Sequence, residues 1–354
     1  MEEEMQNKRL AYLDMAKGVG IFLVVLGHIE YIEETTLRWI FSFHMPLFFV
    51  IGGFLSYKKR EESKNLPDSL KSKARGILIP YVSFSLILLT MNTVSCLLDP
   101  KFLSGEALAR QYLDTATGYG VHILWFLPAY FIASASFLIL MKKCRPVMSG
   151  VFVIFLAAVS GLLASLLGLD QYLNFSLSFW GYAGFDLLIT FLRAFLAQPF
   201  LLAGWVLAAA EEKISRRTEL SERRLCFLPG VLLVLPGAWL ALKLPVFDLH
   251  YLYITPLHYL SALCTSTGLL CLTGSLPPVR PLCWMGRNSL VIMCTHATFF
   301  VVYYISLGMF FVKKWIPMTQ PVFNLGVAIL VCIAELPVVW IFNRYFRHLL
   351  GRAK

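Results

Sequence analysis

Long apolar runs alternate with short polar segments along the whole chain, and this pattern predicts its elements. Each run holds about 20 residues, the length that an α-helix needs to cross the hydrocarbon core of a membrane. The pattern predicts ten spans, at about 10–31, 37–57, 76–97, 121–141, 147–168, 183–210, 225–242, 254–275, 289–312 and 321–343. We therefore expect an all-α, polytopic membrane protein whose single membrane domain covers residues 1–354.

Composition leads to the same class. Hydrophobic residues make up 58% of the 354 residues and charged residues only 15%, which excludes a soluble globular domain. The first nine residues are too acidic for the start of a signal peptide, and no small-x-small cleavage pattern follows the first run. We expect the first span to be kept in the mature protein.

The net charge of +10 is unevenly distributed. Of the 31 Lys and Arg residues, 24 fall in alternate segments: the N-terminal segment through Lys17, 58–75, 142–145, 211–224, 276–288 and 344–354. This asymmetry follows the positive-inside rule, so we expect both termini in the cytoplasm and no nucleic-acid partner. For the basic segment 58–75 two interpretations stay open: a solvated loop near anionic lipid headgroups, or a surface that receives an anionic cytoplasmic cofactor.

Metal and disulfide chemistry find no support in the sequence. The eight Cys residues lie through or beside the spans and form no Cys-x-x-Cys motif, as is typical of small core residues. No pair of His or carboxylate residues has ligand spacing on one helix, so we expect no metal.

Candidate chemistry is concentrated in the first two spans. Lys17 and His28 bracket ten Gly, aliphatic and aromatic residues. On a helix the step between them rotates by roughly 20° and rises about 16 Å, so both lie on one face. Asp14, one turn before Lys17, joins that face. Because ionisable groups inside a spanning helix are costly and usually functional, the group is a candidate site. The alternative for His28 is an interfacial residue that anchors the end of the helix.

Five short motifs carry a family resemblance. Lys17, ten residues and His28 resemble the first-span signature of the acyltransferase family 3 integral-membrane proteins, in which the basic residue is usually Arg. The run from Phe43 through His44 to Leu55 resembles the second-span motif of stand-alone members similar to sugar O-acetylases. Three further segments resemble the family's later motifs in family order: His122-Ile-Leu-Trp125, Arg193 to Gly204, and Gly286-Arg287-Asn288-Ser289 with His296. Together they cover nearly the whole chain.

The resemblance implies roles for particular residues. It implies acetyl-CoA, or another acyl-CoA, as a cytoplasmic donor and an extracytoplasmic or lipid-linked carbohydrate as acceptor. The expected catalytic residues are His28, Lys17 and His44, the expected cofactor-binding residues are Lys17, Arg287 and Arg193, and the expected substrate-binding residues are His122, Trp125, His296 and Asp14. Because Lys17 replaces Arg, it would act on phosphate as a point charge rather than as a bidentate clamp.

Structural alternatives stay open for several of these residues. His44 could serve a hydrogen bond between helices. Arg193 could pair with Asp186, two turns earlier on the same face, to keep two helices in register. Asn288 or Ser289 could cap the helix that follows. Glu335, inside the last span, needs a partner that the sequence does not identify.

The function we predict is membrane-embedded O-acetylation of a carbohydrate, in the plasma membrane of a bacterium, with membrane lipids as surroundings. The competing hypothesis from another class is a transporter or flippase for a lipid-linked sugar, with the buried charges lining its pathway. A non-catalytic scaffold of a glycan-synthesis complex is a third.

Overall fold

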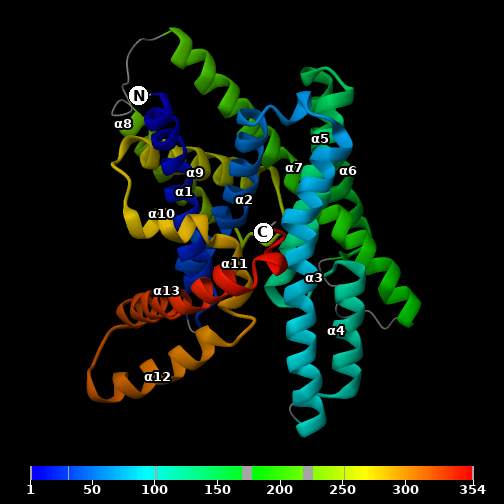
Figure 1. Cartoon of the computed structure of the whole chain (residues 1–354), viewed down its shortest axis with the longest axis vertical. Helices are drawn as coiled ribbons and strands as arrows, with labels where there is room; N and C mark the ends of the chain where they lie inside the picture. The colour runs from blue at the N-terminus through cyan, green and yellow to red at the C-terminus, as the bar shows by residue number, and fades with distance from the viewer. Residues whose placement is uncertain are drawn as a thin grey trace. The chain divides into compact units, whose positions relative to one another are not determined.

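The computed structural model describes residues 2–30, 32–99, 101, 103–169, 178–217, 226–250 and 252–352. Within these residues every regular element is a helix (Figure 1). The α-helices are α1 (Glu2–Gly27), α2 (Glu34–Lys58), α3 (Leu66–Leu98), α4 (Gly105–Thr117), α5 (Phe126–Lys143), α6 (Pro146–Leu166), α7 (Phe179–Arg217), α8 (Phe227–Lys243), α9 (Pro256–Ser275), α10 (Arg280–Arg287), α11 (Ser289–Thr295), α12 (Val301–Trp315) and α13 (Gln320–Tyr345). Short 3₁₀ helices are η1 (Glu61–Ser63), η2 (His122–Trp125) and η5 (Arg347–Leu350).

The prediction of an all-α membrane protein is confirmed. In the described part of the chain, six helical segments are long and apolar enough to cross a membrane: Glu34–Lys58, Leu66–Leu98, Gly105–Lys143, Pro146–Leu166, Phe179–Ile214 and Gln320–Tyr345. Phe227–Lys243 is a shorter apolar helix. The count of ten spans and the cytoplasmic termini stay predictions.

One predicted span is wrong as a continuous helix. The apolar run 289–312 is divided into α11, which has 7 residues, and α12, which has 15. Between them Phe300 adopts a φ of 57°, in the left-handed region, and a right-handed helix cannot continue through such a residue. Hydrophobicity alone could not reveal this break, because the run is apolar on both sides of it.

The predicted outer loop 98–120 also contains a helix. Ser104 caps the N-terminus of α4 by accepting a hydrogen bond from the Ala107 N–H at 3.2 Å, and Gly118 ends the helix with a φ of 74°. The segment 58–75 is likewise largely helical, since it holds η1 and the start of α3, and Lys73 pairs with Glu61 at 2.7 Å.

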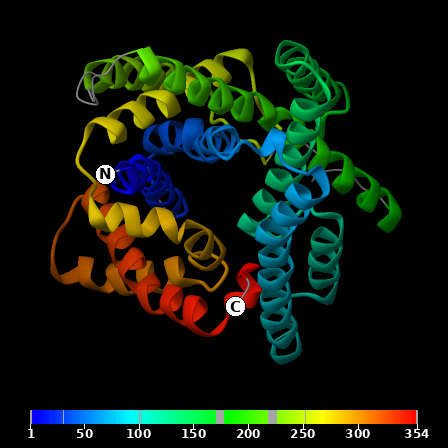
Figure 2. The same ribbon diagram turned by 45° about the horizontal axis from the view of Figure 1, so that its top comes forward.

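The chain forms two compact units. Unit 1 comprises residues Met1–Lys59, Ala203–Asp248 and Ile254–Val339, and unit 2 comprises Arg60–Leu202, Leu249–Tyr253 and Trp340–Lys354. In unit 1, α1 packs against α2, α9, α10 and α11, and α8 packs along α9. In unit 2, α3 packs against α4, α5 and η5, and α5 packs against α6 (Figure 2). The prediction of a single domain stays a prediction.

Glycines allow a very close contact between two helices of unit 1. A Cβ atom on Gly18 would lie 2.0 Å from the carbonyl oxygen of Leu282, and one on Gly286 would lie 1.8 Å from that of Asp14. Only a residue without a side chain fits at either place. The crossing of α1 and α10 therefore brings the segment of Asp14 and Lys17 against the end of α10.

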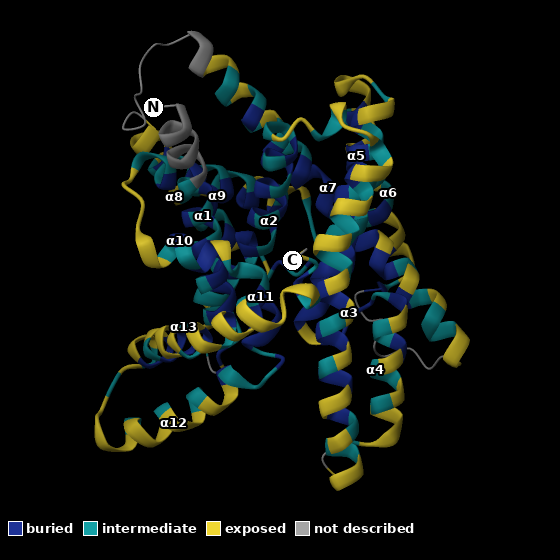
Figure 3. Cartoon of the chain, in the orientation of Figure 1, coloured by how far each residue is buried: buried dark blue, intermediate teal, exposed yellow. Residues whose placement is uncertain are grey.

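Several helices have exposed faces (Figure 3), and these faces carry large apolar side chains. In α6 only 28% of the most apolar stretch is buried within the protein, and in α13 only 33%. Large side chains such as Phe152 and Phe155 of α6 are exposed. A soluble protein rarely exposes apolar surface of this extent, and such helix faces are expected to contact lipid.

Candidate active site

His28 follows the last residue of α1. Its backbone N–H donates to the Val25 carbonyl at 3.2 Å, and its ring Nδ1 lies 2.7 Å from the Val24 carbonyl oxygen. The imidazole is thereby fixed against the last turn of the helix. Helix α1, which contains Lys17, thus ends at Gly27, one residue before His28. The rise of about 16 Å expected between Lys17 and His28 is therefore almost entirely along this helix.

Two further histidines of unit 1 share this arrangement. His296 follows α11, and its Nδ1 lies 2.7 Å from the Ile292 carbonyl oxygen. His44 lies within α2, and its Nδ1 lies 2.9 Å from that of Ile40. The rings of His28 and His296 are in contact, with centroids 5.2 Å apart and planes at 77°. His28 is also close enough to both other histidines for charges on the rings to interact.

These contacts fix the tautomer of each ring. A carbonyl oxygen can only accept, so each Nδ1 that contacts one must carry the hydrogen. In the neutral imidazole Nε2 then carries the lone pair, which is the nitrogen that can take a proton from a substrate. His258 has the opposite tautomer, because its Nδ1 accepts from the Thr255 N–H at 3.1 Å and its Nε2 donates to the Pro245 carbonyl at 3.1 Å. It caps α9 rather than offering a base.

The cationic end of the site lies at α1 and α10. Lys17 Nζ lies 3.5 Å from Asp14 Oδ1, and each side chain is 23% exposed, so the pair is only partly shielded from water. Arg287 is the last residue of α10 and donates from Nε to the Cys283 carbonyl at 3.2 Å. The expectation that Asp14 and Lys17 share a face agrees with this ion pair.

The helix cap expected at Asn288 takes a different form. Asn288 stands at the N-cap position of α11, but its side chain makes no capping hydrogen bond there. Its Nδ2 donates instead to the Trp284 carbonyl at 2.8 Å and so ties the end of α10. The reason is local: α11 follows α10 directly, and the open carbonyls of α10 are the nearest acceptors.

The partner of Glu335 is Thr295. Thr295 Oγ1 lies 2.6 Å from Glu335 Oε2 and 2.8 Å from the Val291 carbonyl oxygen, and both Thr295 and Glu335 are fully buried. Thr295 directly precedes His296. Sequence reasoning missed Thr295, since a hydroxyl in an apolar run gives no sign of its partner.

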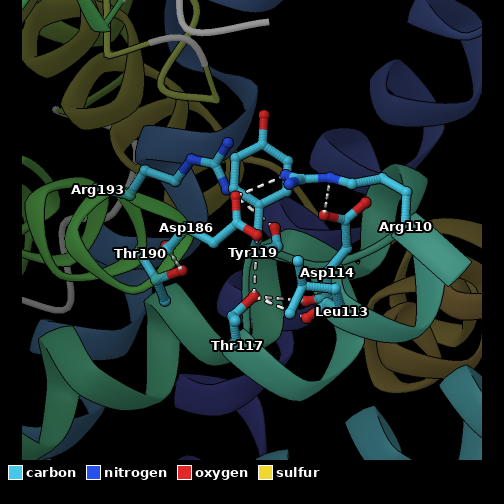
Figure 4. Close-up of polar contacts among 8 residues, drawn as sticks. All are labelled: Arg110, Leu113, Asp114, Thr117, Tyr119, Asp186, Thr190 and Arg193. Carbon is cyan, nitrogen blue, oxygen red and sulfur yellow. Dashed lines mark hydrogen bonds and ion pairs between the residues drawn. The ribbon is translucent and has the colours of Figure 1, made fainter. Parts of the chain in front are cut away.

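Unit 2 contains a separate polar cluster (Figure 4). Arg110 of α4 contacts Asp114 at 2.9 Å from Nε and Asp186 of α7 at 2.6 Å from Nη2. Thr117 Oγ1 approaches the second oxygen of Asp186 at 3.5 Å. Asp186, for which the sequence suggested Arg193 as a partner, thus forms an ion pair with Arg110, on a helix that the sequence predicted as a loop.

Arg193 joins two loops. Its Nε donates to the His250 carbonyl and its Nη1 to the Tyr119 carbonyl, both at 2.9 Å. The guanidinium lies 4.3 Å from the Tyr119 ring centroid and 5.3 Å from that of Trp125. Because Arg193 is fully buried, these contacts satisfy a charge that would otherwise be costly.

The loop residue His250 packs between the same aromatic rings. Its ring centroid lies 5.5 Å from that of Tyr119 and 5.3 Å from that of Trp125. Burial, and after it the charge of Arg193, hold the pKa of His250 well below its usual value. His250 is therefore neutral at physiological pH.

The structure groups the predicted site residues into two sets. Within unit 1 it brings His28 into contact with His296 and pairs Lys17 with Asp14. Within unit 2 it brings Arg193 to Trp125. His122 lies exposed at the start of η2 with a φ of 50°, a strained conformation for a residue with a side chain. The roles assigned to these residues stay predictions.

Sequence reasoning missed Arg110 and Asp114 of this cluster. The spacing of Arg110 and Asp114, four residues apart on an amphipathic segment, is the signal that could have revealed both the helix and the ion pair.

Comparison with known proteins identifies the family. A family model described as an acyltransferase domain matches residues 10–344. The chain therefore belongs to acyltransferase family 3, and it is an integral-membrane acyltransferase. The resemblance inferred from the motifs is confirmed.

A curated relative shares part of the chain. Nodulation protein NolL of Mesorhizobium japonicum is 30% identical over 137 residues, which cover 36% of this chain and 35% of that protein. The match thus spans about a third of its length. No solved structure matches the chain.

Proposed function

We propose that the protein transfers an acetyl group from acetyl-CoA to a hydroxyl group of an extracytoplasmic or lipid-linked carbohydrate. Membership of the family supports the reaction class and excludes a protein that only transports or only serves as a scaffold. The observation that carries the mechanism is the contact between His28 Nδ1 and the Val24 carbonyl oxygen at 2.7 Å, from which we infer that Nε2 is the nitrogen able to act as the base.

In the proposed step His28 is a general base. Its Nε2 takes the proton of the acceptor hydroxyl while the oxygen forms a bond to the acyl carbon. The carbon–sulfur bond breaks, and its electron pair leaves with the sulfur of coenzyme A. The proton held by His28 passes to this thiolate, so that coenzyme A leaves as a thiol and the imidazole returns to its neutral state.

The donor would be held nearer the N-terminus of α1 than His28, at Lys17. Lys17, within α1, and Arg287, at the end of α10, supply positive charge on the side that the charge distribution assigns to the cytoplasm, and coenzyme A carries phosphates. The rise of about 16 Å from Lys17 to His28 is comparable with an extended pantetheine arm. Asp14 keeps Lys17 oriented until a phosphate competes for it.

The remaining residues receive proposed roles in the acceptor and acyl sites. His44 assists near His28, while His122 and Trp125 contact the carbohydrate. Arg193 already donates to two carbonyls, so any contact with the acyl oxygen would use its remaining nitrogen, Nη2. The surroundings we propose are the plasma membrane of a bacterium.

Membrane vesicles supplied with radiolabelled acetyl-CoA test this function. Wild-type vesicles are expected to move label into a carbohydrate, identified by mass spectrometry as an ester. His28→Ala should abolish incorporation while the amount of protein in the membrane stays the same. His348→Ala, a change at an exposed histidine of η5, is the matched control and should stay active. Full activity of His28→Ala would remove this base from the mechanism, and label in lipid or protein alone would contradict the acceptor class.

A further inference from the structure

A carboxyl group lies within the buried face of α13. Val327, Val331, Glu335 and Val339 follow one another at every fourth position, and each is at most 2% exposed. Residues with this spacing form one stripe along a helix, so Glu335 occupies a place where the stripe would otherwise hold an apolar side chain. The function proposed above gives this carboxyl group no part.

The two contacts of the Thr295 hydroxyl bear on the protonation state of Glu335. Thr295 Oγ1 lies 2.6 Å from Glu335 Oε2 and 2.8 Å from the Val291 carbonyl oxygen. A hydroxyl group has one hydrogen to donate, and a carbonyl oxygen and an ionised carboxylate have none. If Glu335 were ionised, one of the two contacts would lack a hydrogen. If Glu335 is protonated, it donates to Thr295 Oγ1, which donates in turn to the Val291 carbonyl, and each contact contains one hydrogen.

The surroundings of Glu335 favour the protonated form as well. No Lys, Arg or His in the described part of the chain lies within ion-pair distance of Glu335, and its Oε1 is buried with no hydrogen-bond partner there. The titratable groups close to it among the same residues are the thiols of Cys294 and Cys332, which are uncharged near neutral pH. An ionised carboxylate would therefore hold its charge in an apolar interior with a single hydrogen bond, and its desolvation costs more than that bond returns.

We propose that Glu335 is a proton-binding residue of the membrane interior, a neutral acid at pH 7 whose hydrogen bond to Thr295 positions α11 against α13. The inference goes beyond the proposed function and does not depend on it, because neither of its tests involves acetyl transfer.

Helix α11 needs such a bond. It has only 7 residues, too few for an isolated helix to be stable, and it ends at the irregular segment before α12. The bond from Glu335 reaches its last residue, Thr295. His296, one of the predicted site residues, follows directly, so the bond fixes the end of the helix that leads into this residue.

Infrared spectroscopy tests the protonation state. The protein is studied at pH 7 in dodecyl maltoside, a detergent without carbonyl groups, and the spectrum of Glu335→Gln is subtracted from that of wild type. We expect the difference to contain the carbonyl band of a protonated carboxylic acid. Thr295→Val removes the acceptor of its hydrogen bond and should move this band to higher frequency. Thr298→Val is the matched control and should leave the band in place, since Thr298 is also buried but its hydroxyl has no partner among the described residues.

Two spectroscopic results would overturn the proposal. The first is a pair of carboxylate bands in the difference spectrum in place of the acid band, because Glu335 would then be ionised. The second is an acid band that Thr295→Val leaves unchanged, because the proton of Glu335 would then not be donated to Thr295.

Hydrogen–deuterium exchange tests the positioning of α11. Glu335→Val matches the valines of the stripe but removes the bond, whereas Glu335→Gln keeps a neutral side chain whose amide can donate to Thr295. We expect the amides of α11 to exchange about tenfold faster in Glu335→Val than in wild type, and at the wild-type rate in Glu335→Gln. Thr295→Val should resemble Glu335→Val, and it supplies the same test if Glu335→Val does not fold. Wild-type exchange in the variants without the bond, or equally fast exchange in Glu335→Gln, would contradict the positioning role.

Discussion

Replacing Arg193 by Lys should destabilise unit 2 although the charge is kept. Arg193 donates to the carbonyls of His250 and Tyr119 at 2.9 Å each, and its flat guanidinium lies over the Tyr119 and Trp125 rings. A lysine ammonium is a compact charge that cannot reach both carbonyls and lie over the rings at once.

The magnitude follows from these contacts. A hydrogen bond from a charged group contributes about 1.5–3 kcal/mol, and a buried carbonyl left without a donor adds to the loss. Losing one such bond and part of the ring contact should cost about 2–4 kcal/mol. For a protein of this size the melting temperature should fall by roughly 5–10 °C.

The assay is thermal unfolding of the protein purified in detergent, followed by the loss of monodisperse material. Arg38→Lys is the control, because Arg38 forms an ion pair within one helix with Glu34, whose side chain is 69% exposed. Such pairs contribute about 0–1 kcal/mol. If Arg193→Lys has the same melting temperature as wild type and Arg38→Lys, the contacts of Arg193 do not stabilise the loops that contain Tyr119 and His250.

Two further predictions follow from the packing and the charges. The pKa of His250 is lowered in the folded state, so on acidification the unfolded chain takes up a proton at this residue before the folded protein does. The stabilising contribution of the neutral His250 is therefore complete above about pH 6.5 and is lost as the pH falls below that value. His250→Gln should make the melting temperature fall less steeply than in wild type between pH 7 and pH 5, and parallel curves would contradict this. Gly286→Ala would place a Cβ 1.8 Å from the Asp14 carbonyl oxygen and force α10 away from α1, so we expect a loss of about 1–3 kcal/mol and a raised KM for acetyl-CoA. Gly308→Ala, which meets nothing within 4 Å, should be neutral or slightly stabilising, and a Gly286→Ala that behaves like it would refute the tight crossing.

Hydropathy predicted the helices well and their interruptions poorly. A long apolar run is a local property, and the helices α2, α3, α6 and α13 lie where such runs predicted them. The break after α11 depends on one left-handed residue, Phe300, and the helix α4 lies in a stretch that is too polar to resemble a span. The mean hydropathy of a region therefore reveals neither the break at Phe300 nor the helix α4.

The candidate site was predictable where partners are near in sequence. Asp14 and Lys17 are one turn apart, so helix geometry alone places them together. His28 and His296 are brought into contact by tertiary packing alone, as are Arg110 and Asp186, which lie 76 residues apart. For Asp186 the sequence suggested Arg193 on the same helix face, and the structure also pairs this carboxylate with Arg110 of α4. The spacing of residues along one helix cannot predict a partner on another helix.

The most direct test of the account is the initial rate of acetyl transfer by purified protein in nanodiscs, with wild type and His28→Ala compared at equal protein. The account predicts a rate at least about 100-fold lower for the variant, because the base that takes the hydroxyl proton is gone. Equal rates would contradict it.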